Sequence, residues 1–240
     1  MISKKDVIPL IDLTSLNTTD SATTIHKLIQ LANSGHEGTH PASVCVYPKF
    51  AKQIKQNINK PIQTCVVSTY FPSSQAPLEL KLAEINYLNT VDIDEIDIVL
   101  PIGEFLANNY KYIDTELNAI RGATSKKLKL IIETGLLLEP KHVEKATLMG
   151  IESGMNFIKT STGKTTIGAD IESVKVMAKT IKYSGAHVGL KIAGGIKTHT
   201  SALSYIETCA AILGDSFINP SSFRIGASSL YSELIANENG

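Results

Sequence analysis

The chain has 240 residues, of which 43% are hydrophobic and 19% are charged, a balance typical of a globular protein with a substantial core. Lysine plus arginine and aspartate plus glutamate both number 23, so no overall charge favours nucleic acid or an anionic membrane as a partner. No apolar run approaches the ~18 residues of a membrane span, and the first residues lack the apolar stretch of a signal peptide. Cys45, Cys65 and Cys209 lie in apolar segments, which predicts reduced core cysteines in a cytoplasmic protein.

Eight short segments have the apolar, β-branched composition of buried strands. They are residues 7–14, 43–48, 63–69, 95–101, 127–134, 157–162, 187–195 and 223–229. Helical spacing of apolar residues lies between most of them, clearest in residues 79–89 and 170–183. Thr18, Thr19 and Asp20 are predicted to cap a further helix that runs to about Asn33 and ends at Ser34-Gly35.

This alternation predicts an α/β fold. Eight βα units in one chain of this length indicate a (β/α)8 TIM barrel, which typically needs ~250 residues. The alternative is an open doubly wound sheet, which usually carries a glycine-rich first turn, and residues 13–17 contain no glycine. No linker or low-complexity tract divides the chain, so we expect a single domain over residues 1–240.

Three charged residues lie within strand segments that are otherwise apolar. Period-two alternation places Asp97 opposite Ile96 and Ile98, and it places Lys159 and Lys191 opposite their own apolar neighbours. If the apolar faces pack on the helices, all three charges point into the barrel, where they would compensate one another. The two lysines come from neighbouring strands, so their amines are expected to lie close together.

A buried pair of amines suggests covalent catalysis. A lysine amine is nucleophilic only without its proton, and a second ammonium nearby lowers the pKa of the first. A carboxylate across the barrel can hold Lys191 charged and relay protons through water. This hypothesis requires that no carboxylate neutralises Lys159 directly. The alternative is that these residues are ordinary strand-end charges paired with one another.

Two glycine-serine segments indicate an anion site. Gly194-Gly195 follows the seventh strand segment, and Ser228-Ser229 follows the eighth and is expected to open a helix. Barrels often bind phosphate with backbone N–H groups in these two loops. Gly163 and Lys164, after the sixth strand, are expected to close the pocket. The alternative is plain turn chemistry, in which glycine supplies a positive φ.

Two motif matches fail on their context. Gly163-Lys164-Thr165 resembles the end of a P-loop, but the first glycine of that motif would fall at Ile158. Residues 36–40 match H-E-x-x-H, which binds zinc only on a helix, and here Gly38 and Pro41 favour a loop. The other histidines show no ligand spacing. We therefore predict no metal and no cofactor.

Segments of all eight predicted strands resemble 2-deoxyribose-5-phosphate aldolase. The resemblance covers almost the whole chain, and residues 157–163 are its most specific part. It rests on the segments DLTSL (12–16), CVYP (45–48), EIDIV (95–99), IETG (132–135), FIKTSTG (157–163), LKIAGG (190–195) and FRIGASS (223–229).

The resemblance implies a metal-independent class I aldolase. It would reversibly cleave 2-deoxy-D-ribose 5-phosphate to D-glyceraldehyde 3-phosphate and acetaldehyde, in the cytoplasm and as a homodimer. Lys159 would form the Schiff base, Lys191 would lower its pKa, and Asp97 would relay protons. Six residues would surround the phosphate, and two more lie on strands that line the family's site. The six are Gly163, Lys164, Gly194, Gly195, Ser228 and Ser229, and the two are Asp12 and Cys45.

The chain departs from the family's pattern at three places. Ile192 stands where many members have proline, and Lys197 stands where arginine is frequent. The tail, residues 231–240, lacks the terminal tyrosine that some members bring to the site. Two other functions stay open on the residues alone: a Schiff-base aldolase acting on a keto acid or ketose phosphate, and a barrel that binds a sugar phosphate without chemistry.

Overall fold

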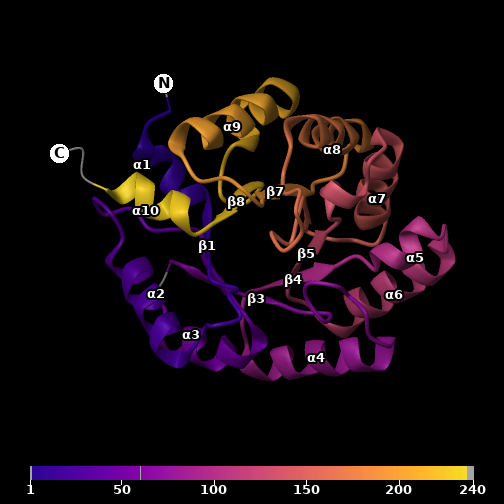
Figure 1. Cartoon of the computed structure of the whole chain (residues 1–240), viewed down its shortest axis with the longest axis horizontal. Helices are drawn as coiled ribbons and strands as arrows, with labels where there is room; N and C mark the ends of the chain where they lie inside the picture. Colours follow the sequence, from indigo (N-terminus) through magenta and orange to yellow (C-terminus); the bar gives the residue numbers. More distant parts are fainter. Residues whose placement is uncertain (1, 60, 237–240) are drawn as a thin grey trace.

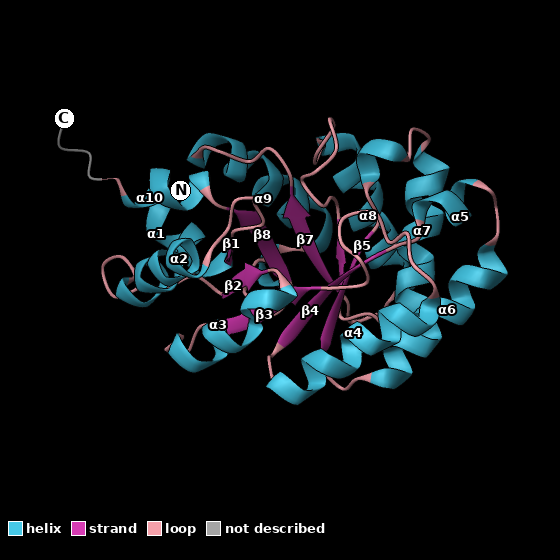
Figure 2. Ribbon diagram, turned by 60° about the horizontal axis from the view of Figure 1, so that its bottom comes forward, coloured by secondary structure: helices cyan, strands magenta, loops and turns pink. Residues whose placement is uncertain are grey.

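A computed structural model describes residues 2–59 and 61–236. Its eight parallel strands close into one barrel in the order β1 to β8, with the helices arranged around them (Figures 1 and 2). The predicted (β/α)8 barrel is confirmed, and the open sheet is excluded. The strands are β1 (Ile11–Thr14), β2 (Ser43–Val46), β3 (Gln63–Val67), β4 (Glu95–Val99), β5 (Lys127–Ile131), β6 (Phe157–Lys159), β7 (Gly189–Ala193) and β8 (Phe223–Ala227).

Helices follow the strands and cover the outside of the barrel. The first and last helices, α1 and α10, lie side by side (Figure 1). The helices are α1 (Lys4–Val7), α2 (Ala22–Ser34), α3 (Ala51–Asn57), α4 (Leu78–Val91), α5 (Ile102–Leu106), α6 (Tyr110–Ala123), α7 (Pro140–Glu152), α8 (Ile171–Ser184), α9 (His199–Leu213) and α10 (Ser229–Ile235). Four 3-10 turns, at Ile8–Leu10, Pro48–Phe50, Thr134–Leu136 and Asp215–Phe217, complete the elements.

Period-two alternation sorts the strand residues between two environments. Ile96 and Ile98 of β4, like Leu190 and Ile192 of β7, belong to the main apolar cluster shared with the helices. The intervening residues point into the barrel, as predicted for Asp97. The apolar layer outside the strands therefore forms the main core, whereas the barrel interior combines charged side chains with a smaller apolar cluster that includes Cys45, Cys65 and Val67.

The predicted strands are longer than the observed ones, most clearly at the start. Residues 7–10 are not extended: Val7 ends α1, and Ile8–Leu10 forms a 3-10 turn around Pro9. Proline lacks the N–H group that a strand inside a closed barrel must donate, so β1 begins only at Ile11.

The helix predictions hold, with one wrong cap. Ser21 caps α2 by accepting a hydrogen bond from the N–H of Thr24, and Gly35 ends that helix with φ 60°. Asp20, a predicted cap, instead accepts hydrogen bonds from Ser15 and Asn17. Asp170 caps α8, and α4 spans the predicted residues 79–89.

One ion pair is buried between two outer helices. Lys81 Nζ of α4 lies 2.7 Å from Glu116 Oε1 of α6, and each side chain is only 1% exposed. Both residues of this pair lie on outer helices, so the pair is separate from the charged side chains inside the barrel. It offers a test of fold stability that leaves the interior unchanged.

Residues 36–40 form a tight loop in which His36 pairs with Thr39, so the zinc-type helix is absent there. All three cysteines are free and buried. Across the described part of the chain, no helix has both the length and the apolar character to cross a membrane. The end of the tail, residues 237–240, lies outside the described residues, and with it the comparison with the family's terminal tyrosine.

Candidate active site

Two amines and one carboxylate meet inside the barrel. Lys159 of β6 and Lys191 of β7 are register partners on neighbouring strands. The Nζ atoms of both lie 2.7 Å from the same oxygen atom, Asp97 Oδ2 of β4. The predicted juxtaposition of these three residues is therefore present in the structure.

One expectation about this trio is wrong. The sequence argument required that no carboxylate contact Lys159 directly, and Asp97 does so. In a closed barrel, inward side chains from strands far apart in sequence can lie at the same level along the barrel axis. Asp97 therefore contacts both amines rather than that of Lys191 alone. Within the described part of the chain, the carboxylate oxygen that contacts Lys159, Asp97 Oδ2, is shared with Lys191.

Four more charged residues extend the trio beneath it. Lys191 Nζ lies 2.6 Å from Asp12 Oδ2, and Arg224 bridges Asp12 at 2.6 Å and Glu95 at 3.1 Å. Lys129 Nζ lies 2.6 Å from Glu95 and 3.2 Å from Asp97 Oδ1. All are at most 2% exposed. We call the set the ion-pair cluster: Asp12, Glu95, Asp97, Lys129, Lys159, Lys191 and Arg224.

The sequence analysis did not identify Glu95, Lys129 or Arg224. The same alternation that identified Asp97 would have found them, because Glu95 shares the inward face of Asp97 on β4. Likewise, Arg224 lies between Phe223 and Ile225, which both belong to the outer core. The signal was present, but which acid meets which base depends on barrel stagger.

Two carboxylates of this cluster, Asp12 and Asp97, have lowered pKa values. Burial raises the pKa of Asp97, but the ammonium groups of Lys129, Lys159 and Lys191 outweigh burial and hold that pKa well below its usual range. Burial likewise opposes ionisation of Asp12, and Lys129, Lys191 and Arg224 overcome it. Burial lowers the pKa of Lys191, but Asp12 and Asp97 raise that pKa by more than burial lowers it. The net shift is upward, and Lys191 stays charged.

The charge count distinguishes Lys159 from the other bases. The buried ion-pair cluster contains four basic and three acidic groups, so these seven are neutral together only when one base lacks its proton; Lys127, whose side chain is 46% exposed, lies 3.7 Å from Glu95 at the edge of the cluster. Lys191, Lys129 and Arg224 each contact at least two carboxylates. Lys159 contacts one, and shares it. Lys159 is therefore the base with the fewest carboxylate contacts in the cluster.

A cavity of about 240 Å³ opens above Lys159, at the carboxyl ends of the strands. Its lining includes Lys164 and Lys197 and, among the residues that the structure describes, no acidic side chain, so the cavity favours an anion. All six predicted phosphate-site residues line it. The lining is Thr14, Leu16, Asn17, Lys159, Thr162, Gly163, Lys164, Ala193, Gly194, Gly195, Ile196, Lys197, Gly226, Ala227, Ser228 and Ser229.

The backbone of this cavity offers hydrogen-bond donors on one side. The N–H groups of Gly194, Gly195 and Ser228 have no acceptor among the described residues. Gly194 has φ 99°, and a Cβ atom there would lie 2.9 Å from the Cα of Gly168. Only glycine therefore allows this loop to approach its neighbour.

On the opposite side the donors are already engaged. The N–H of Gly163 donates to Ser161 Oγ, and that of Lys164 donates to Thr162 Oγ1. Glu133, which is 2% exposed, accepts hydrogen bonds from the Ser161 and Thr162 hydroxyl groups. Glu133 thus fixes the loop after β6, and Lys164 can contribute its ammonium group rather than its N–H.

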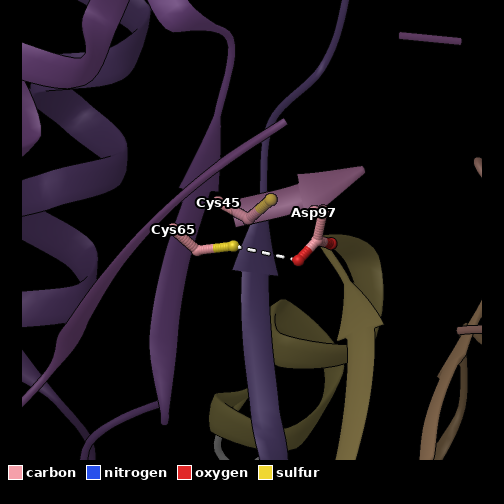
Figure 3. A group of neighbouring side chains, drawn as sticks. All are labelled: Cys45, Cys65 and Asp97. Atoms are coloured by element: carbon pink, nitrogen blue, oxygen red, sulfur yellow. Dashed lines mark hydrogen bonds between the residues drawn. The ribbon is translucent and has the colours of Figure 1, made fainter. Parts of the chain in front are cut away.

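Asp12 and Cys45 lie outside the cavity lining. Asp12 belongs to the ion-pair cluster and is fully buried. Cys45 of β2 and its register partner Cys65 of β3 point toward Asp97, and Cys65 Sγ donates a hydrogen bond to Asp97 Oδ1 at 3.2 Å (Figure 3). These placements bring both residues beneath the cavity rather than around it.

A larger cavity, of about 550 Å³, lies at the other end of the strands. It is lined by residues at strand starts, including Lys127, Asn156, Gly189 and Ser222. No member of the ion-pair cluster lines it. Barrel enzymes carry their chemistry at the carboxyl ends, so size alone does not make this the reaction site.

Known proteins resemble this chain over nearly its full length. The sequence model described as "DeoC/LacD family aldolase" matches residues 6–231. A Caenorhabditis elegans protein described as "Putative deoxyribose-phosphate aldolase" is 38% identical over 244 residues, which cover 96% of this chain and 80% of the relative.

Two solved structures have the same fold. One, described as "QR15, an Aldolase", is 29% identical with a TM-score of 0.81, covering 95% of this chain and 94% of its own. The other, deoxyribose phosphate aldolase from Aeropyrum pernix, is described as having a unique tetrameric structure. It is 25% identical with a TM-score of 0.76, covering 97% of this chain and 91% of its own.

Proposed function

This chain belongs to the DeoC/LacD family of aldolases, and from that membership and the site geometry we propose its substrate and its catalytic residues. The proposed reaction is reversible cleavage of 2-deoxy-D-ribose 5-phosphate to D-glyceraldehyde 3-phosphate and acetaldehyde through a Schiff base on Lys159. The observation that carries this proposal is Lys159 itself, a buried amine that lines an anion-favouring cavity and shares one carboxylate oxygen with Lys191.

The charge count explains how an amine contacted by Asp97 serves as a nucleophile. Loss of the Lys159 proton leaves three bases and three acids in the ion-pair cluster, which is the balanced state of a buried group. The attack of neutral Nζ on C1 gives a carbinolamine, and loss of water gives an iminium. This cation takes the place of the ammonium beside Asp97 Oδ2, so the contact that opposes deprotonation also stabilises the intermediate.

The balance of charges in the ion-pair cluster also favours cleavage of the C2–C3 bond. Cleavage of C2–C3 moves its electron pair into the iminium, and the resulting enamine has a neutral nitrogen, which restores charge balance. The C3 hydroxyl proton leaves through water and the Asp97–Lys191 pair. Protonation of the enamine at C2 and hydrolysis then release acetaldehyde and free Lys159.

The phosphate is proposed to bind at the far side of the cavity. The donors are the N–H groups of Gly194, Gly195 and Ser228, with the hydroxyl of Ser229 and the ammonium groups of Lys164 and Lys197. Gly163 shapes the loop that carries Lys164. Binding energy from the phosphate, remote from the reacting carbons, holds C1 against Lys159.

We also propose that the protein is cytoplasmic and forms a homodimer. Two side chains on one side of the barrel, Leu138 before α7 and Tyr183 of α8, are each 83% exposed, which supports a subunit contact there. Light scattering of the purified chain measures the oligomeric state. A single subunit mass at all concentrations would contradict the dimer.

A coupled assay for release of glyceraldehyde 3-phosphate from 2-deoxyribose 5-phosphate tests the function. We expect turnover that a chelator leaves unchanged and that Lys159→Ala abolishes. Binding of the sugar phosphate without turnover in the intact chain would indicate a sensor. Turnover of keto acids in preference would indicate a different aldolase.

A further inference from the structure

Two thiols and a carboxylate converge at one point of the barrel interior, beside the reacting lysine (Figure 3). Cys45 of β2 and Cys65 of β3 are direct register partners. Their Sγ atoms and a carboxylate oxygen of Asp97 all lie within 4.8 Å of one another, and all three residues are fully buried. We propose that Cys45, Cys65 and Asp97 form an inhibitory site for a thiophilic divalent cation, Zn²⁺ or Cd²⁺.

The donor set suits such an ion. Two thiolates and one carboxylate are ligands that zinc and cadmium accept, whereas magnesium and calcium require oxygen donors. Around a tetrahedral ion with metal–sulfur distances of about 2.3 Å, the ligand atoms lie roughly 3.8 Å apart. The trio is already nearly this close, so binding needs a contraction of about 1 Å or less.

Charge does not oppose binding despite the surrounding lysines. The ion displaces one proton from each thiol, so the cation and two thiolates add no net charge to the ion-pair cluster. Cys65 gives up its hydrogen bond to Asp97 Oδ1, which the metal replaces. Lys129 Nζ loses its contacts with Asp97 Oδ1 and with Cys65 Sγ, to which it donates at 3.3 Å, but keeps Glu95 at 2.6 Å and Asp12 at 3.3 Å.

Inhibition follows from Asp97. That carboxylate is the only one in contact with Lys159 among the described residues, and a cation on its Oδ1 withdraws negative charge from Oδ2, the oxygen that contacts both Lys159 and Lys191. Oδ2 is then a weaker proton acceptor, and the proposed proton relay slows. Inhibition therefore depends on the proposed function, whereas metal binding does not.

The test titrates the purified chain with Cd²⁺ and measures binding by the ultraviolet thiolate-to-cadmium charge-transfer band. Leu16, Tyr47 and Phe71 pack against the thiols, so each point is read after long incubation. Variants Cys45→Val and Cys65→Val remove one ligand each. Cys209→Ala is the matched control, since Cys209 is also buried but lies on α9. Circular dichroism checks that every variant is folded.

We expect one Cd²⁺ per chain, a charge-transfer band that weakens as pH falls, and loss of aldolase activity in parallel with binding. Either valine variant should weaken binding by more than about 100-fold, the upper end of what loss of an outer-sphere partner costs. Cys209→Ala should bind as the parent chain does. Mg²⁺ should have no effect.

Three results would overturn the proposal. The first is absence of the charge-transfer band at saturating Cd²⁺, and the second is its loss in Cys209→Ala. The third is dependence on Cys65 but not Cys45, which would place the ion among Asp12, Cys65 and Glu95 instead. If the chain has no aldolase activity, the band and its stoichiometry still decide the site.

Discussion

Replacement of Lys191 by leucine tests whether one ammonium tunes the other. Both Nζ atoms lie 2.7 Å from Asp97 Oδ2, so they are at most about twice that distance apart. Two unit charges about 5 Å apart at an effective dielectric constant of ~20 repel by about 3 kcal/mol. Removal of Lys191 ends this repulsion and leaves Asp97 Oδ2 to Lys159 alone, and both changes favour the protonated amine.

The expected result is an alkaline shift of the rate profile. The full repulsion corresponds to about 2 pH units, and Asp12, 2.6 Å from Lys191, already offsets part of it. We therefore expect the acid limb of the kcat/KM profile to move up by about 1 unit, with low activity at neutral pH that partly recovers in alkaline buffer. Lys191→Arg, which keeps the charge, is the matched control. An unshifted profile in Lys191→Leu, with activity retained, would refute electrostatic tuning.

Three further predictions concern phosphate binding and stability. Lys164→Ala and Lys197→Ala should each raise KM for 2-deoxyribose 5-phosphate about tenfold, from loss of one charged hydrogen bond, but not KM for unphosphorylated deoxyribose; equal effects on both sugars would contradict the phosphate site. Lys81→Met should lower the free energy of unfolding by about 3–5 kcal/mol, because it leaves Glu116 buried and unpaired. Each kcal/mol lost should lower Tm by about 2–4 °C. Lys81→Met combined with Glu116→Leu should recover most of that loss, and no recovery in thermal melts would show that the pair itself stabilises. Because Asp12 has a lowered pKa, its stabilisation is present above its ordinary value near 4 and lost as pH falls toward the lowered one. Denaturant midpoints between pH 7 and pH 3 should therefore fall less steeply in Asp12→Asn than in the parent chain, and parallel slopes would contradict this.

The barrel could be predicted because its periodic signal is local. Apolar alternation in β4 and β7 identified both the outer face and the inward charges Asp97 and Lys191. Glycines 163, 194 and 195 all have a positive φ, as expected of turns that only glycine adopts readily. These features depend on residues that are neighbours along the chain.

The contacts across the barrel could not be predicted in the same way. Asp97 and Lys191 are 94 positions apart, and the stagger of the closed sheet decides that one carboxylate oxygen meets two amines. The same holds for Arg224 and Asp12, which are 212 positions apart. The sequence placed the correct residue types inside the barrel, whereas the number of acids and bases there, and hence the charge balance, required the structure.

The role of Glu133 also depends on tertiary contacts. Its segment contributed to the family resemblance, but its backbone adopts φ 50° and its carboxylate accepts hydrogen bonds from the loop after β6. From sequence alone, an acidic residue close to a predicted phosphate site would be expected to weaken anion binding. The structure shows that it faces the loop's hydroxyl groups and is absent from the cavity lining.

Borohydride reduction in the presence of acetaldehyde or 2-deoxyribose 5-phosphate, followed by peptide mass analysis, tests the central claim most directly. The charge balance of the ion-pair cluster predicts a single covalent adduct on Lys159, absent from Lys159→Ala, with Lys129 and Lys191 unmodified. An adduct on Lys191 or Lys129, or active enzyme that forms no adduct at all, would contradict it.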